Sequence, residues 1–334
     1  MTIPVIAFFN NKGGVGKTSL VYHLSWMFSD SGLKVLAADL DPQSNLTAAF
    51  LDEEKLAQTL WCGGSIATIH QCLVPLITGT GDVADLEYQI IADDLALVPG
   101  DMRLAGFEEE LSQDWPKCLD GRERSFRVES ALWRITQNAA RHFAAKVIIV
   151  DLGPNLGAIN RAALIGADFV VIPLGPDLFS LQGLENLGPA LRQWRGEWKD
   201  RLARQPREAI ELPRGIIKTT GYIFIRNSIR LDRPAKAFDR WIAKIPATYA
   251  KSVLERDQPA TLTIDNDPNC IARLKDYRSL MPLAQEARKP IFHLTPADGA
   301  LGAHTQAVSN ARDDFKTLAA EIARRARLPD RLQE

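Results

Sequence analysis

The chain has 334 residues, of which 46% are hydrophobic and 24% charged, and its formal net charge is −1. This composition is ordinary for a globular protein that is long enough to bury a sizeable core. Because the net charge is close to zero, no overall field draws the chain onto nucleic acid or anionic lipid, and binding of either would need a local patch.

Membrane-spanning proteins and zinc proteins are disfavoured at this stage. No apolar run approaches the ~20 residues that span a bilayer. The cysteines form no C-x-x-C pair, and no histidine lies at zinc-ligand spacing from them; they are Cys62, Cys72, Cys118 and Cys270. We therefore expect free thiols in a reducing cytoplasm, and Met1 leads directly into the first strand without a signal peptide.

The first predicted element is a short apolar strand, Val5 to Phe9, which leads into a glycine-rich turn and a helix that begins near Lys17. Glycines let successive backbone N–H groups converge on phosphate oxygens, and the start of the helix adds a partial positive charge. Lys17 would neutralise the β- and γ-phosphates, and the Thr18 hydroxyl would ligate Mg²⁺. Position 11 is Asn, where the G-x-x-x-x-G-K-[ST] pattern begins with Gly. The predicted nucleotide-binding residues of this loop are Lys12, Gly13, Gly14, Val15, Gly16, Lys17, Thr18 and Ser19.

The string KGGVGKT, from Lys12 to Thr18, resembles the deviant Walker A loop of the ParA/MinD family of partition and positioning ATPases. The resemblance implies ATP and Mg²⁺ as cofactors. It also implies that Lys12 reaches across a dimer interface to the nucleotide of the other subunit, so that Lys12 and Lys17 both act in catalysis.

Residues 18–31 predict a helix, because their apolar residues recur at helical spacing. The next strand, Lys34 to Ala38, is followed by the alternating carboxylates Asp39 and Asp41, which at this end of a parallel strand would lie beside the phosphate loop. The string DLDPQSNLT is similar to the second motif of ParA proteins. This implies that Asp41 positions the attacking water and reaches Mg²⁺ through water, while Asp39 supports the loop or the water shell of the metal. The alternative is a strand-end cap before the turn at Pro42.

The stretch from residue 52 to residue 145 gives fewer signals. We expect a helix from Ser65 to Leu76 and a strand from Leu95 to Val98. The polar segment Asp114 to Arg127 predicts an exposed insertion, part of a divergent stretch around residues 105–130. An amphipathic helix should follow over residues 128–143.

The unbroken apolar run from Lys146 to Leu152 predicts a central strand that is buried on both faces. It ends in Asp151, which at this place is a Walker B carboxylate that holds Mg²⁺ through water. The alternative is an acidic strand-end residue without a metal. ParA proteins usually have two prolines shortly after this aspartate, and here Gly153 takes the place of the first.

A helix from Leu156 to Gly166, a buried strand over residues 167–173 and a long helix from Leu184 to Arg204 should follow. The long helix contains Arg192, Arg195 and Lys199, which are the candidates for contacts to the phosphate backbone of DNA. The resemblance favours this role, since ParA dimers bind DNA without sequence preference. The alternative is a solvated charged face with no partner.

The last third of the chain is predicted mainly by resemblance. Residues 221–225 predict a strand and residues 242–247 continue the pattern; Asn227 and Pro246 are the adenine candidates by analogy with the family. Residues 288–292 resemble a late Lys-Pro stretch of these proteins, within a C-terminal part that diverges around residues 230–290. The closing helix, Ala307 to Arg327, would dock on the core or, as in membrane-targeting members, lie on a bilayer; its alanine-rich apolar face favours docking.

Together these elements predict a single α/β domain over residues 1–334, with one doubly wound, mostly parallel sheet and helices on both faces. The resemblance implies a slow P-loop ATPase that dimerises on ATP, binds DNA non-specifically and releases it on hydrolysis. A centromere-binding or cargo-adaptor protein would stimulate turnover, in the cytoplasm and on the nucleoid when ATP is bound. The alternative is a membrane-associated positioning ATPase similar to MinD. No helix-turn-helix precedes the loop, so operator-specific repression is not expected.

Overall fold

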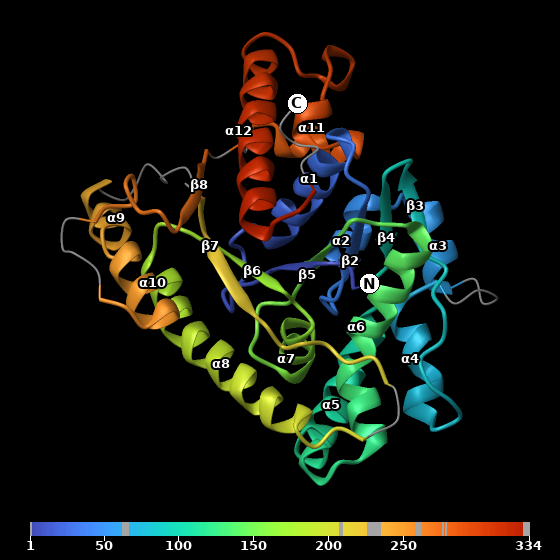
Figure 1. Cartoon of the computed structure of the whole chain (residues 1–334). Coiled ribbons are helices and arrows are strands. Elements are labelled where there is room, and N and C mark those ends of the chain that lie inside the picture. The colour runs from blue at the N-terminus through green and yellow to red at the C-terminus, as the bar shows by residue number, and fades with distance from the viewer. Residues whose placement is uncertain are drawn as a thin grey trace.

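The computed structural model describes residues 2–61, 67–206, 210–225, 235–257, 262–275, 277 and 279–329. Within them, one eight-stranded sheet has the strand order β3-β4-β2-β5-β1-β6-β7-β8 (Figure 1). Neighbouring strands are parallel except β3 and β4 at one edge. The strands are β1 (Val5–Phe8), β2 (Val35–Asp39), β3 (Gln89–Ala92), β4 (Leu95–Val98), β5 (Val147–Asp151), β6 (Phe169–Leu174), β7 (Lys218–Ile225) and β8 (Cys270–Leu274). The predicted mostly parallel sheet is confirmed, and β3 and β8 are strands that the sequence analysis missed.

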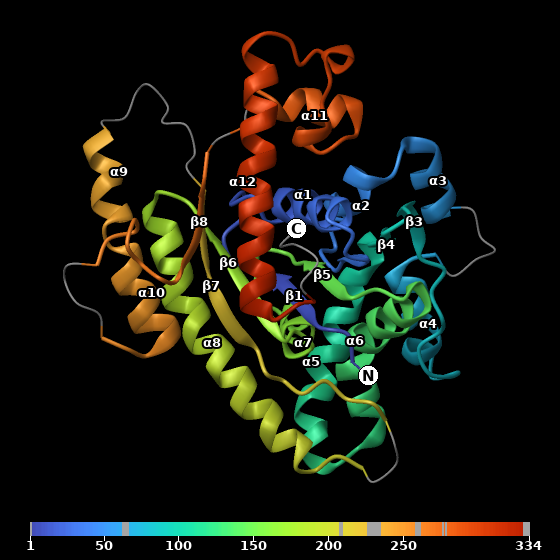
Figure 2. The same cartoon turned by 45° about the horizontal axis from the view of Figure 1, so that its top comes forward.

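Helices cover both faces of this sheet. Figures 1 and 2 show α1 and α12 on one face and α5, α6, α7 and α8 on the other. The helices are α1 (Lys17–Asp30), α2 (Asn45–Phe50), α3 (Glu53–Trp61), α4 (Ile69–Thr78), α5 (Phe107–Lys117), α6 (Glu123–Phe143), α7 (Ala158–Ile165), α8 (Leu178–Leu202), α9 (Ala235–Ile242), α10 (Ile245–Leu254), α11 (Met281–Ala287) and α12 (Ala303–Ala326). The doubly wound arrangement is therefore confirmed.

The central strand β1 shows why its sequence has no polar residue. Ile6 and Phe8 belong to the apolar core that α1 and α12 complete, whereas Val5 and Ala7 belong to the core beneath α6 and α8. Successive side chains of a strand point to opposite faces, so a strand covered on both sides must be apolar throughout.

The prediction that the segment Asp114–Arg127 is exposed is wrong in part: Asp120 and Arg122 are exposed, but other residues of the segment are folded into the core. Helices α5 and α6 extend into it from either side, and Asp114 and Phe126 are buried. The buried carboxylate of Asp114 accepts hydrogen bonds from the Ser125 hydroxyl at 2.6 Å and from the Arg124 guanidinium at 3.0 Å. Polar residues that satisfy one another can be buried, and composition alone does not reveal such pairing.

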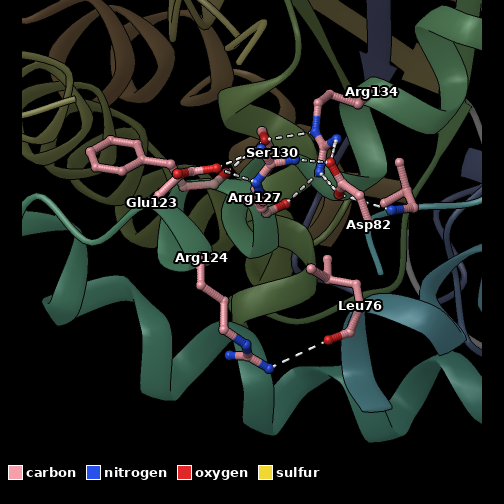
Figure 3. A network of polar contacts seen from close by, with 9 residues as sticks. Leu76, Asp82, Glu123, Arg124, Arg127, Ser130 and Arg134 are labelled. Atoms are coloured by element: carbon pink, nitrogen blue, oxygen red, sulfur yellow. Dashed lines mark hydrogen bonds and ion pairs between the residues drawn. The ribbon is translucent and has the colours of Figure 1, made fainter. Parts of the chain in front are cut away.

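Helix α6 is also fastened to the loop that follows α4 (Figure 3). Two arginines of α6 converge on Asp82: Arg134 donates to its carboxylate oxygens at 2.7 and 2.8 Å, and Arg127 forms a second ion pair with it. Arg124 also reaches the carbonyl oxygen of Leu76, at 3.5 Å. These contacts join α4 to α6. Helix α6 begins at Glu123, five residues earlier than predicted.

A buried carboxylate in α6 gives the first testable prediction. Burial raises the pKa of Glu129 to about 8, although Arg161 and Arg201 act against the shift. The folded protein therefore holds a proton between pH 4.5 and about 8 that the unfolded chain has lost, so this group reduces stability as the pH rises through that window. In chemical denaturation, the free energy of unfolding of Glu129→Gln relative to that of the wild type should rise by about 1 kcal/mol or more between pH 5 and pH 8. Curves that keep a constant separation at every pH would contradict this, and Glu109→Gln, an exposed site, is the control.

Two further predictions about helices need correction. Helix α8 begins at Leu178 rather than Leu184, because the Asp177 carboxylate caps it by accepting the Ser180 N–H at 3.0 Å. Residues 242–247, which were expected to continue the strand pattern, contain the end of α9 and the start of α10. Pro246 stands in the first turn of α10, where the missing N–H of proline costs nothing.

The closing helix α12 docks on the core as predicted. Phe315, Leu318 and Ile322 are buried in the cluster that includes α1. Arg325 fixes the end of the helix by donating to the carbonyl oxygens of Thr220 (2.8 Å) and Pro268 (2.9 Å). Among the described residues, no helix has both the length and the apolar character needed to cross a bilayer.

Candidate functional site

The carboxyl ends of β1, β2 and β5 meet at one edge of the sheet, where Asp39 is in register with Asp151. A cavity of about 780 Å³ opens at this edge. Its lining includes most of the predicted phosphate loop and part of the second motif, namely Gly13, Gly14, Gly16, Lys17, Thr18, Ser19, Asp41 and Gln43. Open parallel sheets bind their ligands at this edge, so the fold and the motifs indicate the same place.

The backbone of the loop depends on two of its glycines. Gly14 and Gly16 have φ angles of 72° and 79°, a region that residues with a side chain rarely adopt. Gly16 directly precedes α1 and provides no side-chain cap. The first N–H groups of α1 therefore stay available to an anion in the cavity.

Lys17 is buried within the loop. Its Nζ atom donates to the carbonyl oxygens of Asn10 at 3.0 Å and Lys12 at 3.2 Å. Burial lowers the pKa of Lys17, and the negative charges of Asp151 and Asp41 act against that shift. A phosphate would give this ammonium the full counter-charge that two carbonyl groups cannot supply.

Lys12 turns away from the cavity of its own chain. Its Nζ atom lies 2.5 Å from Asp177 Oδ2, and it is not among the residues that line the cavity. Val15 is buried and also lies outside the lining. Because Asp177 is held by its cap on α8, the loop lysine is attached to a fixed point beside the cavity.

The two carboxylates at the carboxyl end of β2 have different surroundings. Asp39 Oδ2 accepts the backbone N–H of Thr47 at 2.8 Å and its hydroxyl at 2.7 Å, and burial raises the pKa of Asp39 to about 6 against these bonds. Asp41 lines the cavity, where Oδ1 accepts the Gln43 N–H at 3.0 Å. Asp41 thus faces the cavity and Asp39 faces α2, while the catalytic role of Asp41 stays a prediction.

Asp151 is buried at the end of β5, and its Oδ2 atom has no hydrogen-bond partner among the described residues. Burial and the charge of Asp39 raise the pKa of Asp151 to about 8, while Thr18 and Lys17 act the other way. A buried carboxylate without a hydrogen-bond partner is the arrangement expected beside a divalent cation, whose positive charge would compensate the negative charge of Asp151. The residues therefore fit Mg²⁺, while the roles of the Thr18 hydroxyl as a ligand and of Asp151 and Asp41 through water stay predictions.

The loop after Asp151 approaches Asp41 closely. A Cβ atom on Gly153 would lie 3.2 Å from Asp41 Oδ1, so the glycine leaves room for that carboxylate. Asn160 holds the loop in shape, since its Nδ2 atom donates to the carbonyl oxygens of Gly153 at 2.9 Å and Asn155 at 2.8 Å. The loop is thus fixed from α7 even without the first proline.

The wall of the cavity beyond the phosphate loop comes from residues that the sequence analysis left without a role. These are Met281, Ala284, Gln285, Arg288 and Lys289 of α11 and the turn after it, with Tyr22 and His23 of α1. The similarity of residues 288–292 to the family was the available signal. Of the adenine candidates, Asn227 lies outside the described residues, and Pro246 is buried in α10 and is not brought to the cavity lining.

The basic residues proposed for DNA differ in their contacts. Arg192 donates to the carbonyl oxygen of Ser252 at 2.5 Å, which joins α8 to α10, and Arg195 donates to the carbonyl oxygen of Ile217 at 2.5 Å. Lys199 is exposed. Two of the three candidates thus already have structural contacts within the chain.

Comparison with known proteins agrees with this site. The family model described as "AAA domain" (AAA_31) matches residues 3–203. The sporulation initiation inhibitor protein Soj of Bacillus subtilis is 33% identical over 183 residues, which are 55% of this chain and 62% of Soj. The chromosome partitioning protein ParA of Caulobacter vibrioides is 29% identical over 203 residues, which are 61% of this chain and 67% of that protein. The chain thus aligns with about two thirds of the length of these relatives.

Two solved structures share the fold over nearly the whole length. Protein DIP2308 of Corynebacterium diphtheriae has a TM-score of 0.68 at 21% identity, covering 97% of this chain and 99% of that one. The ATP complex of Cyanothece McdA(D38A) has a TM-score of 0.61 at 16% identity, covering 96% and 97%. The family match over residues 3–203, with the glycine loop and the carboxylates at the same sheet edge, shows that the chain belongs to the ParA/MinD family of P-loop proteins.

Proposed function

We propose that this chain is a ParA-like ATPase that dimerises when it binds ATP and Mg²⁺, binds DNA without sequence preference in that state, and releases it after hydrolysis. The observation that supports this most is the cavity at the carboxyl edge, where free N–H groups, the buried ammonium of Lys17 and the carboxylate of Asp41 converge beside Asp151. Such a set binds a triphosphate and leaves one carboxylate free to orient water.

The chemistry assigned to the chain is positioning and charge neutralisation. The N–H groups of the loop and Lys17 would hold the β- and γ-phosphates, and bound Mg²⁺ would neutralise charge between them. Asp41 would accept a hydrogen bond from the attacking water and so orient it in line with the γ-phosphate. Because the chain supplies few groups beyond these, intrinsic turnover should be slow, and a centromere-binding or cargo-adaptor protein would accelerate it.

The face around the cavity suits a second copy of the chain. Large apolar side chains are exposed there after the ends of β4, β5 and β6, and they are Met102, Leu156, Leu178 and Phe179. Exposed apolar groups around a polar site are typical of an interface. Two copies that close over this face would bring Lys12 of each next to the cavity of the other. DNA would then contact exposed cations such as Lys199 through its phosphates.

The membrane alternative has less support. An amphipathic helix that binds a bilayer must present its apolar face to lipid. The apolar face of α12 is already buried against α1, so in this arrangement it is not available.

The second prediction tests dimerisation through Lys12. With a non-hydrolysable ATP analogue, light scattering should show the wild type as a dimer, and the same sample should retain DNA in a salt-sensitive manner. Lys12→Ala should bind the analogue with an affinity within about threefold of the wild type yet stay monomeric and lose DNA retention, since the missing charge belongs to the other subunit's site. Lys55→Ala, an exposed lysine far along the chain, is the matched control. A wild type that stays monomeric at saturating analogue would refute the proposal.

A further inference from the structure

Glu108, in the first turn of α5, contacts the start of α7 across fifty residues of chain. Its Oε1 atom accepts the N–H of Ala158, and its Oε2 atom accepts the N–H of Ile159 at 2.9 Å. Both oxygens of one carboxylate therefore bind the first two N–H groups of a helix. The sequence analysis gave this residue no role.

Helix α7 has no cap of its own. Its N-cap residue is Gly157, which has no side chain to offer. A Cβ atom at this glycine would collide with Glu108 Oε1 and lie 3.0 Å from Asn155 Oδ1, so the carboxylate occupies most of the space that a local capping side chain would need. Glu108 thus performs from α5 the task that Ser, Thr or Asp usually performs at the N-cap.

The capped helix directly continues the loop that approaches Asp41. The loop runs from Gly153 to Gly157, and Asn160 of α7 holds its carbonyl groups. Any shift of the first turn of α7 therefore also moves Gly153. This glycine lies so close to Asp41 that a Cβ atom added to it would be 3.2 Å from Asp41 Oδ1.

Helix α5 is a firm platform for this contact. Arg161 of α7 donates to the carbonyl oxygen of Leu111 at 3.0 Å, and its guanidinium lies 4.3 Å from the ring centroid of Trp115. Two contacts one turn apart, those of Glu108 and Arg161, hold α7 against α5. The Glu108 contact fixes the N-terminal end of α7, which is the end nearer the site.

We propose that Glu108 is a positioning residue for hydrolysis: by capping α7 it fixes the loop Gly153–Gly157 beside Asp41, and so sets the turnover rate rather than the affinity for nucleotide. This rests on the proposed ATPase function. A misplacement of about 1 Å in such a loop can cost up to about a hundredfold in rate.

The test is a double-mutant cycle between Glu108 and Gly157. Glu108→Ala should lower kcat about tenfold or more, with the nucleotide Kd within about twofold. Gly157→Ser alone should also lower kcat, because the new side chain collides with the carboxylate. Combining Glu108→Ala with Gly157→Ser should restore much of kcat, since the serine no longer meets the carboxylate, has only the Asn155 Oδ1 atom close to its Cβ atom, at 3.0 Å, and can cap α7 locally. Glu109→Ala, an exposed neighbour on the same turn, is the control and should match the wild type.

Wild-type kcat in Glu108→Ala would overturn the inference, and so would a loss that Gly157→Ser fails to restore in a variant that is folded by circular dichroism. Hydrogen exchange of the amides from 153 to 159 tests, without nucleotide, whether Glu108 stabilises the start of α7. The exchange rates there should rise in Glu108→Ala and fall again in the double variant. If the wild type hydrolyses no ATP, the proposed function fails, and the exchange data still decide whether Glu108 fixes this loop.

Discussion

Replacing Lys17 with alanine should abolish nucleotide binding in any practical range, with affinity for ATP reduced about a hundredfold or more. Each charge-assisted hydrogen bond contributes about 1.5–3 kcal/mol, and Lys17 would make more than one to the β- and γ-phosphates. The ammonium is already buried and aimed by the carbonyl oxygens of Asn10 and Lys12, so little ordering is needed on binding. Isothermal titration with ATP and Mg²⁺ measures the loss directly, and ATP-dependent DNA retention should disappear with it.

Two comparisons make the Lys17 result specific. Lys55→Ala removes an exposed lysine and should leave ATP affinity unchanged. A thermal scan of Lys17→Ala without nucleotide should show a folded protein, because the side chain it removes donates only two hydrogen bonds, both to carbonyl oxygens of the same loop. If ATP-dependent DNA retention survives in a folded Lys17→Ala protein, the proposed function is wrong.

Replacing Asp41 with asparagine should separate binding from turnover. Asparagine keeps the shape of the side chain and an oxygen that can accept the Gln43 N–H, so ATP affinity should change by no more than about threefold. It removes the charge that orients and activates the attacking water, and kcat should fall about a hundredfold or more. A steady-state phosphate-release assay combined with nucleotide titration gives both quantities. The variant should accumulate the ATP-bound, DNA-retaining state.

The neighbouring carboxylate provides the contrast. Asp39 accepts two hydrogen bonds from Thr47 inside the protein, so Asp39→Asn should lower the denaturation midpoint, whereas Asp41→Asn should not. Asp93→Asn, at an exposed turn, is the control for introducing an asparagine. Equal loss of kcat in the Asp39 and Asp41 variants, at equal stability, would contradict the separate roles assigned to them.

The sequence predicted the central part of the fold well because its strands carry an unambiguous signal. β1, β2, β5 and β6 are short apolar runs, and their bounds in the structure differ from the predicted ones by one or two residues. The prediction was wrong where the signal was composition alone. In the polar segment Asp114–Arg127, which was expected to be exposed, Asp114 is buried because it pairs with Ser125 and Arg124, and such pairing depends on residues that meet only after folding.

The sequence by itself determined the phosphate loop, the two aspartates at the carboxyl end of β2, the aspartate that ends β5 and the layered α/β architecture. These depend on short spacings: consecutive residues of one loop, or the residues that directly follow a strand. The tertiary structure alone decided that Lys12 turns to Asp177, that α11 closes the cavity and that Glu108 caps α7. The physical reason is distance along the chain: a contact between residues fifty or more positions apart depends on how whole helices pack, and no local pattern encodes it.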